Sequence, residues 1–412
     1  MMFDQTDRQR ELRASGRVFA QDVLRDIPSQ TDHLLTAAER FAATRPAYEK
    51  MVTEGFLRAC LPQAVGGDAE SLMDTAILVE ELYAGNAGVA LSLIGTVLGV
   101  QPIVVAGSKE QRARLLKPFL SNEGAPLAGF CSSEPGGSAN AAALPPAEGV
   151  RTTARLENNK WIINGRKRWV SSATGWDGNG ADVLCVVCRT DPEATPDKAV
   201  SIIAMRRPVK GLVLEGTIES PGHRAHFLPD FSLKDVVAPR RNLIGREGGG
   251  LALSAASFSD AAALIGILGV ALMRSAFDFT LNFARTQRRG GAVPIIEHQA
   301  VGYALVDAKT SIEAARSLSW RACAAAAGHP AAGELANQSK IFGSETAVRV
   351  ITDLLRIVGV ESYDLSTPLN GLLQDALALP VFAGGNVGVR RRALHALLQS
   401  PTYDPLATAD GH

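Results

Sequence analysis

The stretch WIINGRKRWVSS, residues 161–172, carries the strongest local signals in the chain. Its first residues are aromatic or β-branched and favour a strand. Asn164-Gly165 is a dipeptide typical of two-residue hairpin turns, so we expect a second strand directly after it. That strand ends at the indole of Trp169 and the hydroxyls of Ser171 and Ser172, which together can hold a flat heterocycle with polar edges. The alternative is a hairpin with a tryptophan in the core.

The sequence on either side of this stretch divides into three parts. Short β-like runs separated by Gly, Pro, Asn and Asp continue over residues 126–238 and predict an antiparallel β-barrel or sandwich. Residues 1–125 and 239–412 show helical spacing of apolar residues, and the second part is expected to form a four-helix bundle. Ser108 and Gln111 have the spacing of a capping box and predict a helix start. The fold class is therefore α+β, with a β domain between two helical domains.

Composition excludes several classes of protein. The chain has 412 residues, with 42 basic and 42 acidic side chains, so no charge bias indicates a nucleic-acid or membrane partner. The longest apolar run, Ala261 to Met273, is too short to span a bilayer and predicts a buried helix. The N-terminus is polar, unlike a secretory signal. The five cysteines do not suggest a disulfide framework, and we expect a cytoplasmic protein.

A second motif, CSSEPGG at residues 131–137, also places hydroxyls at the end of a strand, followed by a glycine-rich turn that lets the backbone approach a ligand closely. Two further spacings suggest metal sites but have simpler explanations. Cys185-x-x-Cys188 lies in a predicted strand, where the thiols face opposite sides. His223-x-x-His226 has no third ligand nearby and fits a loop. We therefore predict no metal site.

These stretches, taken together, resemble the acyl-CoA dehydrogenase family of flavoproteins over nearly the whole chain. The resemblance implies the three-domain fold, with FAD bound between the β domain and the bundle. It also implies assembly as a homotetramer or dimer, with a heteromeric assembly as an alternative. The motifs that carry it, in family order, are LPQAVGG at 61–67, GSKEQRARLLKPFL at 107–120, SEPGG at 133–137, INGRKRWVSS at 163–172, DVVAPRRNLIG at 235–245, PIIEHQAVGYALVD at 294–307 and VGVESY at 358–363.

The resemblance also implies roles for individual residues at the flavin. Ser133 would bond the pyrimidine edge of the ring, Trp169 would pack against the ring, Ser171 would bond at or near N5, and the backbone around Cys131 would complete the pocket. The family's pyrophosphate-binding arginine matches Arg285 or Arg288, depending on the loop length. The remaining cofactor positions are His298, Gln299, Gly359, Gly385 and Asn386, and a carboxylate at Glu361 would repel the diphosphate.

The catalytic base of the family falls on Ala383, which cannot accept a proton. Some members carry the base on the helix after the β domain, where alternative matches give Ser259 or Ala261. Asp260 lies between them and is a candidate for a relocated base; the alternative is a solvated carboxylate at a helix start. The positions implied near substrate are Ser138, Gly384 and Arg390.

The sequence thus predicts an FAD-dependent oxidoreductase that acts on an acyl thioester, of CoA or a carrier protein, with a relocated or absent base. Alternatives on the same fold are a flavin-dependent monooxygenase, an enzyme of non-oxidative acyl-CoA elimination, and a non-catalytic subunit of a heteromeric dehydrogenase. An electron-transfer flavoprotein or a flavin reductase would be the redox partner.

Overall fold

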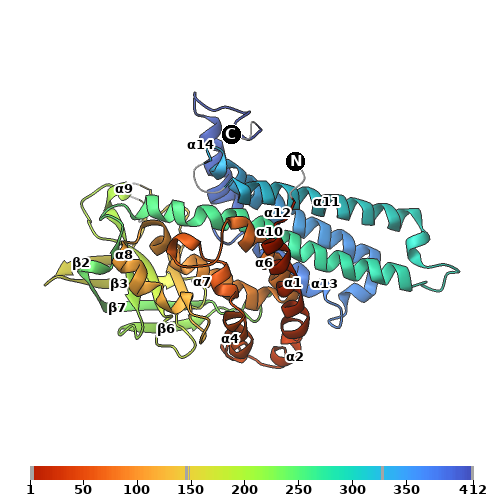
Figure 1. The fold of residues 1–412 in the computed structure, drawn as a ribbon, viewed down its shortest axis with the longest axis horizontal. Helices are drawn as coiled ribbons and strands as arrows, with labels where there is room; N and C mark the ends of the chain where they lie inside the picture. Colours follow the sequence, from red (N-terminus) through yellow and green to blue (C-terminus); the bar gives the residue numbers. More distant parts are fainter. Residues whose placement is uncertain (1–3, 144–146, 148, 326–328, 410–412) are drawn as a thin grey trace.

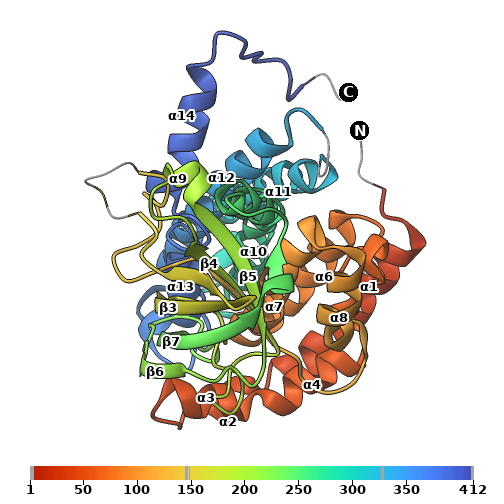
Figure 2. The same cartoon turned by 90° about the vertical axis from the view of Figure 1, so that its left-hand side faces the viewer.

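A computed structural model of the protein describes residues 4–143, 147, 149–325 and 329–409. A mixed β-sheet stands at one end, and long helices extend from it (Figure 1). The N-terminal helices cover one side of both parts (Figure 2). This is the three-domain α+β arrangement that the sequence predicts.

The N-terminal part is helical, as expected. Ser108 caps its last helix: Ser108 Oγ accepts from the backbone of Gln111, and Gln111 Oε1 accepts from the backbone of Ser108 at 2.9 Å, so the capping box is confirmed. The helices are α1 (Asp7–Phe19), α2 (Ile27–Thr31), α3 (Ala37–Ala43), α4 (Arg45–Thr53), α5 (Phe56–Ala59), α6 (Leu72–Gly85), α7 (Ala87–Ala106) and α8 (Lys109–Leu115).

The middle part contains a sheet in the strand order β6-β7-β3-β2-β4-β5-β8, with β1 paired to β4. Most neighbours are antiparallel, but β1 and β2 both run parallel to β4, so the sheet is mixed rather than wholly antiparallel. The elements are β1 (Ala128–Cys131), β2 (Thr153–Glu157), β3 (Lys160–Arg168), β4 (Val183–Arg189), α9 (Pro196–Ala199), β5 (Val200–Arg206), β6 (Leu212–Thr217), β7 (Pro229–Pro239) and β8 (Leu243–Ile244).

The expected hairpin turn at Asn164-Gly165 is wrong. β3 continues through both residues, and its register against β7 shifts there, as in a β-bulge. The Asn164 side chain exchanges two 2.9 Å hydrogen bonds with Asp235 on β7. The turn lies earlier, at Asn158 and Asn159, whose left-handed φ angles of 47° and 63° suit a two-residue hairpin loop.

The C-terminal part is a helical bundle built around α10 (Gly250–Thr286), which runs from the sheet to the far end of the bundle (Figure 1). Gly266 permits this close packing, because a Cβ there would lie 2.3 Å from the hydroxyls of Ser319 and Ser339. α7 and α10 are long and apolar enough to cross a membrane, but most residues of their apolar windows are buried inside the protein. The other helices are α11 (Gln299–Ala324), α12 (Ala332–Val358), α13 (Leu369–Ala378) and α14 (Arg392–Leu398).

Two buried carboxylates join the N-terminal helices to the bundle. Glu80 and Glu81 on α6 are at most 1% exposed. Arg274 on α10 donates to Glu80 at 2.9 Å and to Glu81 at 2.8 Å, and Arg316 on α11 reaches Glu80 at 3.0 Å. Burial alone would raise the pKa of Glu81, but Arg274 and Arg17 hold it below its ordinary value. This network fixes the orientation of α6, α10 and α11.

Candidate active site

The two hydroxyl-rich motifs meet in the structure. The backbone N–H of Arg168, at the end of β3, donates to the carbonyl of Ser133 at 3.1 Å. Ser133 is half-buried, and the next residue on the β3 side, Trp169, has a left-handed φ of 65° and a 52% exposed side chain. A bulky residue in that conformation is strained, and strain of this kind concentrates at functional sites. The buried tryptophan of the stretch is Trp161, so Trp169 leaves its indole available to a ligand.

A buried ion pair anchors the turn that follows Ser133. Lys167 Nζ lies 2.9 Å from Glu134 Oε1, and Glu134 also accepts from the backbone and hydroxyl of Thr152 at 2.9 and 2.6 Å. Burial would raise the pKa of Glu134, but Lys167 and these hydrogen bonds lower it. No local sequence pattern predicts this pair, because Glu134 and Lys167 are 33 residues apart. It fixes Ser133 relative to the end of β3.

Ser171 belongs to a buried hydrogen-bonded chain. His226 Nε2 lies 3.0 Å from Ser171 Oγ, and His226 Nδ1 lies 3.0 Å from Ser92 Oγ on α7. Burial lowers the pKa of His226 to about 3, so the ring is neutral and carries one proton between these two hydroxyls. The neighbouring Ser172 Oγ is buried and has no hydrogen-bond partner among the residues that the structure describes.

The loop that carries His226 also reaches the C-terminal part of the site. The backbone N–H of His226 donates to the carbonyl of His223 at 2.7 Å. The His223 ring packs edge-on against Phe382, with centroids 6.1 Å apart, and its backbone N–H donates to Asp375. Phe382 immediately precedes Ala383, so one loop links Ser171 to the position predicted for the catalytic base.

Ala383 adjoins a buried cation. Ala383 and Gly384 have left-handed φ angles of 50° and 76°. Arg390 is 8% exposed, and its Nη2 donates to the Ala383 carbonyl at 2.6 Å, its Nη1 to Asn337 Oδ1 at 3.2 Å and its Nε to the Gly384 carbonyl at 3.3 Å. Burial lowers the pKa of Arg390 to about 10. None of these three acceptors carries a charge.

The third predicted substrate residue lies on a loop that meets the same segment. Ser138 is exposed. In the residues that follow it, Asn140 Oδ1 accepts from Arg392 Nη1 at 3.1 Å, and the Ala139 carbonyl accepts from the same guanidinium. The loop after the CSSEPGG motif therefore lies against the start of α14, two residues beyond Arg390.

Asp260 lies in the body of α10, ten positions after its first residue, rather than at a helix start. Its side chain is partly buried, burial raises its pKa, and it makes no hydrogen bond or ion pair within the described part of the chain. Ser259 and Ala261 are partly buried beside it. Asp260 also raises the pKa of the buried Cys323 thiol on α11, after the larger effect of burial.

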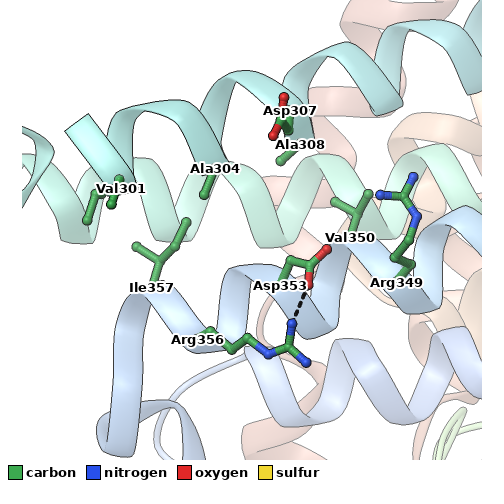
Figure 3. A pocket seen from close by; sticks show the side chains of 10 residues that line it. Val301, Ala304, Asp307, Ala308, Arg349, Val350, Asp353, Arg356 and Ile357 are labelled. Carbon is green, nitrogen blue, oxygen red and sulfur yellow. Dashed lines mark hydrogen bonds and ion pairs between the residues drawn. The ribbon is translucent and has the colours of Figure 1, made fainter. Parts of the chain in front are cut away.

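The residues predicted for the other end of the cofactor lie on the bundle. His298 and Gln299 are exposed at the start of α11, Gly359 ends α12 with a φ of 75°, and Arg285 is exposed at the end of α10. Arg288 donates to the carbonyl of Ala292 in its own loop. Between α11 and α12 runs a surface groove of about 420 Å³ (Figure 3), lined by Ala300, Val301, Ala304, Asp307, Ala308, Arg349, Val350, Asp353, Arg356 and Ile357.

Glu361 and Asn386 both have partners that the sequence did not predict. Glu361 is not a free repelling charge, because Arg289 pairs with it at 2.6 Å and also donates to the Val358 carbonyl. No local sequence pattern predicts this role of Arg289, which is 72 residues from Glu361. Asn386 is 2% exposed, and its side chain is bonded to Lys340, Ser344 and Glu345 within the bundle, while Gly385 precedes it with extended ψ.

The cysteines are core residues. Cys131, Cys185 and Cys188 are 0% exposed, and burial raises the pKa of Cys131 and Cys188 to about 12. The role that the family resemblance implies for Cys131 involves only its backbone, because its thiol is buried. No group of three or more His, Cys, Asp or Glu suited to a metal ion occurs among the residues with described positions.

The residues present fit a flavin ring. The exposed indole of Trp169 could stack on such a ring, and the half-buried Ser133 and Ser171, with the buried and unpartnered Ser172 Oγ, provide hydroxyls at the same strand end for its polar edge. Gly95 allows α7 to pack closely against Ser171, because a Cβ there would lie 2.7 Å from Ser171 Cβ.

Comparison with known proteins agrees with this geometry. The chain matches the N-terminal domain of acyl-CoA dehydrogenase over residues 6–123, the middle domain over 129–236 and the C-terminal domain over 248–398. It is 42% identical over 387 residues to nitroalkane oxidase of Podospora anserina, covering 90% of each chain. It is 28% identical over 372 residues to human mitochondrial short-chain specific acyl-CoA dehydrogenase, covering 89% of this chain and 84% of that one.

A solved structure of nitroalkane oxidase with 1-nitrooctane has a TM-score of 0.96 and 33% identity, with full coverage of both chains. That protein is an active-site mutant in which an aspartate is replaced by asparagine. A second structure concerns the roles of an aspartate of the same number and of an arginine seven positions later in the flavoprotein nitroalkane oxidase. The chain belongs to the acyl-CoA dehydrogenase family of FAD-dependent flavoproteins.

Proposed function

We propose that this protein is an FAD-dependent oxidase of small nitro compounds that lacks the carboxylate base of its nitroalkane oxidase relatives. The observation that carries the proposal is the pair Ala383 and Arg390. Their spacing of seven positions equals that of the aspartate and arginine studied in nitroalkane oxidase. On this spacing Arg390, which is buried, would correspond to the arginine, and Ala383 would correspond to the aspartate.

The chemistry supplied by the flavin is a two-electron oxidation. A nitroalkane, RCH2NO2, and water would give an aldehyde, nitrite and a proton as the C–N bond breaks and a C–O bond to the water oxygen forms. A bound flavin would take up the two electrons and two protons that this reaction releases, with dioxygen as the final acceptor and hydrogen peroxide as its product. The neutral substrate must lose a proton from carbon first, and no group on Ala383 can accept it.

Separate groups of residues would hold the flavin ring and bind the nitro group. Trp169, Ser133 and Ser171 would hold the flavin ring, and His226 orients the Ser171 hydroxyl through the 3.0 Å contact. Arg390 presents a planar fork of donors that matches the two oxygens of a nitro or nitronate group. The apolar ring of Phe382 borders the same place.

Oxidation of an acyl thioester is the second candidate, and the family itself favours it. This reaction needs a base for the α-proton, which Ala383 cannot be. Asp260 is the candidate on α10, because burial raises its pKa and no partner among the described residues holds its charge. An electron-transfer flavoprotein rather than dioxygen would then be the acceptor.

The experiment that separates these candidates is turnover of the purified FAD-loaded protein with two substrate panels. One panel contains short nitroalkanes and their nitronates, with oxygen uptake and nitrite release as readouts. The other contains acyl-CoA thioesters with an artificial electron acceptor. Nitrite release coupled to oxygen uptake supports the oxidase; oxidation of acyl-CoA without any reaction of the nitro compounds would overturn it.

We also propose that the protein acts as a homo-oligomer in the cytoplasm. The oligomer is supported by a set of exposed apolar side chains on helices α11 and α12 of the bundle. Tyr303 and Val306 on α11 are 64% and 61% exposed, and Phe342 on α12 is 40% exposed. Light scattering of the purified protein would test this; a monomer at micromolar concentration contradicts it.

A further inference from the structure

We propose that the substrate enters this site already ionised, as a planar nitronate-type anion, and is bound by Arg390 and Lys340 rather than deprotonated by the protein. This inference rests on the proposed function and specifies its substrate class. The buried charges around Ala383 support it.

Arg390 has an uncompensated charge. Its three hydrogen-bond acceptors are two backbone carbonyls and the Asn337 amide oxygen, and it has no ion-pair partner within the described ranges. A guanidinium that is 8% exposed and has no carboxylate beside it carries the desolvation cost of a buried unpaired ion. An anion bound against it would remove that cost.

Lys340 is a second buried cation near Arg390. Its side chain is 0% exposed, and its Nζ donates to Asn386 Oδ1 at 2.8 Å and to the Leu379 carbonyl at 3.2 Å. Burial, and then repulsion from Arg390, lowers the pKa of Lys340 to about 7. The two cations lie close together, because Arg390 donates to Asn337, three positions before Lys340 on α12, and Lys340 donates to Asn386, four positions before Arg390. Among the residues that the structure describes, neither has a direct carboxylate partner.

The nearest acidic group does not neutralise this pair. Glu345 attracts Lys340, but Arg391 holds it with two hydrogen bonds of 2.6 and 2.8 Å, and Asn386 donates to it at 3.0 Å. Glu345 and Arg391 thus cancel each other. Arg390 and Lys340 remain as an excess of positive charge next to Ala383.

An ionised substrate fits both features of the site. A nitronate, RCH=NO2⁻, needs no base, so the absence of an acidic group at Ala383 costs nothing, and its two oxygens match the guanidinium fork. The reaction balances without a proton acceptor: nitronate and water give aldehyde and nitrite, and the two electrons and two protons pass to the FAD. Dioxygen is the final oxidant, as it is for the neutral nitroalkane.

The test has a reactive and a non-reactive probe. In the first, FAD-loaded protein is mixed anaerobically with ethylnitronate, freshly diluted from alkaline stock, or with neutral nitroethane, and flavin absorbance is followed. Because a general base contributes about 10²–10⁴-fold, we expect bleaching by nitronate to be at least roughly 100-fold faster. Equal rates would overturn the inference while leaving the proposed oxidase standing, and the Asp260→Asn variant would then show whether Asp260 takes the proton.

The second probe is nitrate, a planar anion that cannot be oxidised, with binding measured by calorimetry. We expect Arg390→Gln and, separately, Lys340→Met to weaken nitrate binding at least tenfold, and Arg155→Gln, which removes an exposed β2 cation, to leave it unchanged. Unchanged nitrate binding in both site variants overturns the anion site whatever the turnover panels show. If neither nitro compound reacts but nitrate binding follows this pattern, the proposed oxidase fails and the anion site stands.

Discussion

The Arg390 guanidinium donates a 2.6 Å hydrogen bond to the backbone carbonyl of Ala383, a residue with no ionisable side chain. A buried cation therefore adjoins the position that the sequence predicts for the catalytic base. This relationship separates two properties that usually occur together in one active site, namely binding of a polar substrate and removal of its proton. In the proposed site Arg390 would serve the first, and the Ala383 side chain cannot serve the second.

Trp169→Ala should weaken FAD binding, because its exposed indole would supply the stacking face for the flavin ring. Aromatic stacking contributes about 0.5–1.5 kcal/mol beyond area burial, which corresponds to roughly 3- to 10-fold in the dissociation constant. Fluorescence titration of the apoprotein with FAD measures this. Trp320→Phe, a partly buried residue of α11, is the control. Unchanged affinity and an unshifted flavin spectrum in Trp169→Ala would contradict the stacking role.

His226 should make the protein sensitive to acid. Because its folded pKa is about 3 and its ordinary value is 6.5, the unfolded chain binds more protons between these values. Stability should fall as pH drops below 6.5, by about 1.4 kcal/mol per pH unit from this residue. Urea unfolding at pH 7 and pH 5 checks this. His226→Gln should have a shallower pH slope, and a slope equal to that of the parent protein would show that His226 is not held neutral.

Nitrate affinity should depend on pH through Lys340. The group faces Arg390 and Glu345, which keep their charges near neutrality, so Lys340 is the one among these three that titrates there. A bound anion favours protonated Lys340, so affinity should fall as pH rises through about 7, by up to about tenfold per unit. Lys340→Met should bind nitrate weakly at all pH values. A pH dependence that persists in Lys340→Met would assign the titration to another group.

Arg274→Met should destabilise the protein by about 3–5 kcal/mol, because it leaves two buried carboxylates with too few partners. Differential scanning calorimetry would show a lower melting temperature. Arg356→Met, which removes an exposed ion pair with Asp353 on α12, should change stability by less than about 1 kcal/mol. Similar effects of both substitutions would mean that the Glu80–Glu81 network does not join the domains as described.

Sequence alone predicted the three-part fold, because helical periodicity and short punctuated strands are local signals, and it predicted the convergence of Ser133 with Trp169 through the family resemblance. It did not predict that Asn164-Gly165 forms a bulge, since that depends on Asp235 in a distant strand. The pairing of Glu361 with Arg289, and the chain from Ser171 through His226 to Ser92, were also missed. Each of these contacts joins residues far apart in sequence, so no local pattern encodes it.

The backbone conformation at Ala383 makes substitutions at this position practical, and they test the missing base most directly. Its φ of 50° is unusual for alanine, whereas aspartate and asparagine tolerate this conformation better, so Ala383→Asp and its isosteric control Ala383→Asn should both fold. The decisive measurement is the anaerobic rate of flavin bleaching by neutral nitroethane in the three proteins. We predict that Ala383→Asp raises this rate by about 10²-fold or more, since a base is restored, and that Ala383→Asn leaves it low. A rate for Ala383→Asp no higher than that of Ala383→Asn would contradict the claim that this is a nitro-compound site without its base.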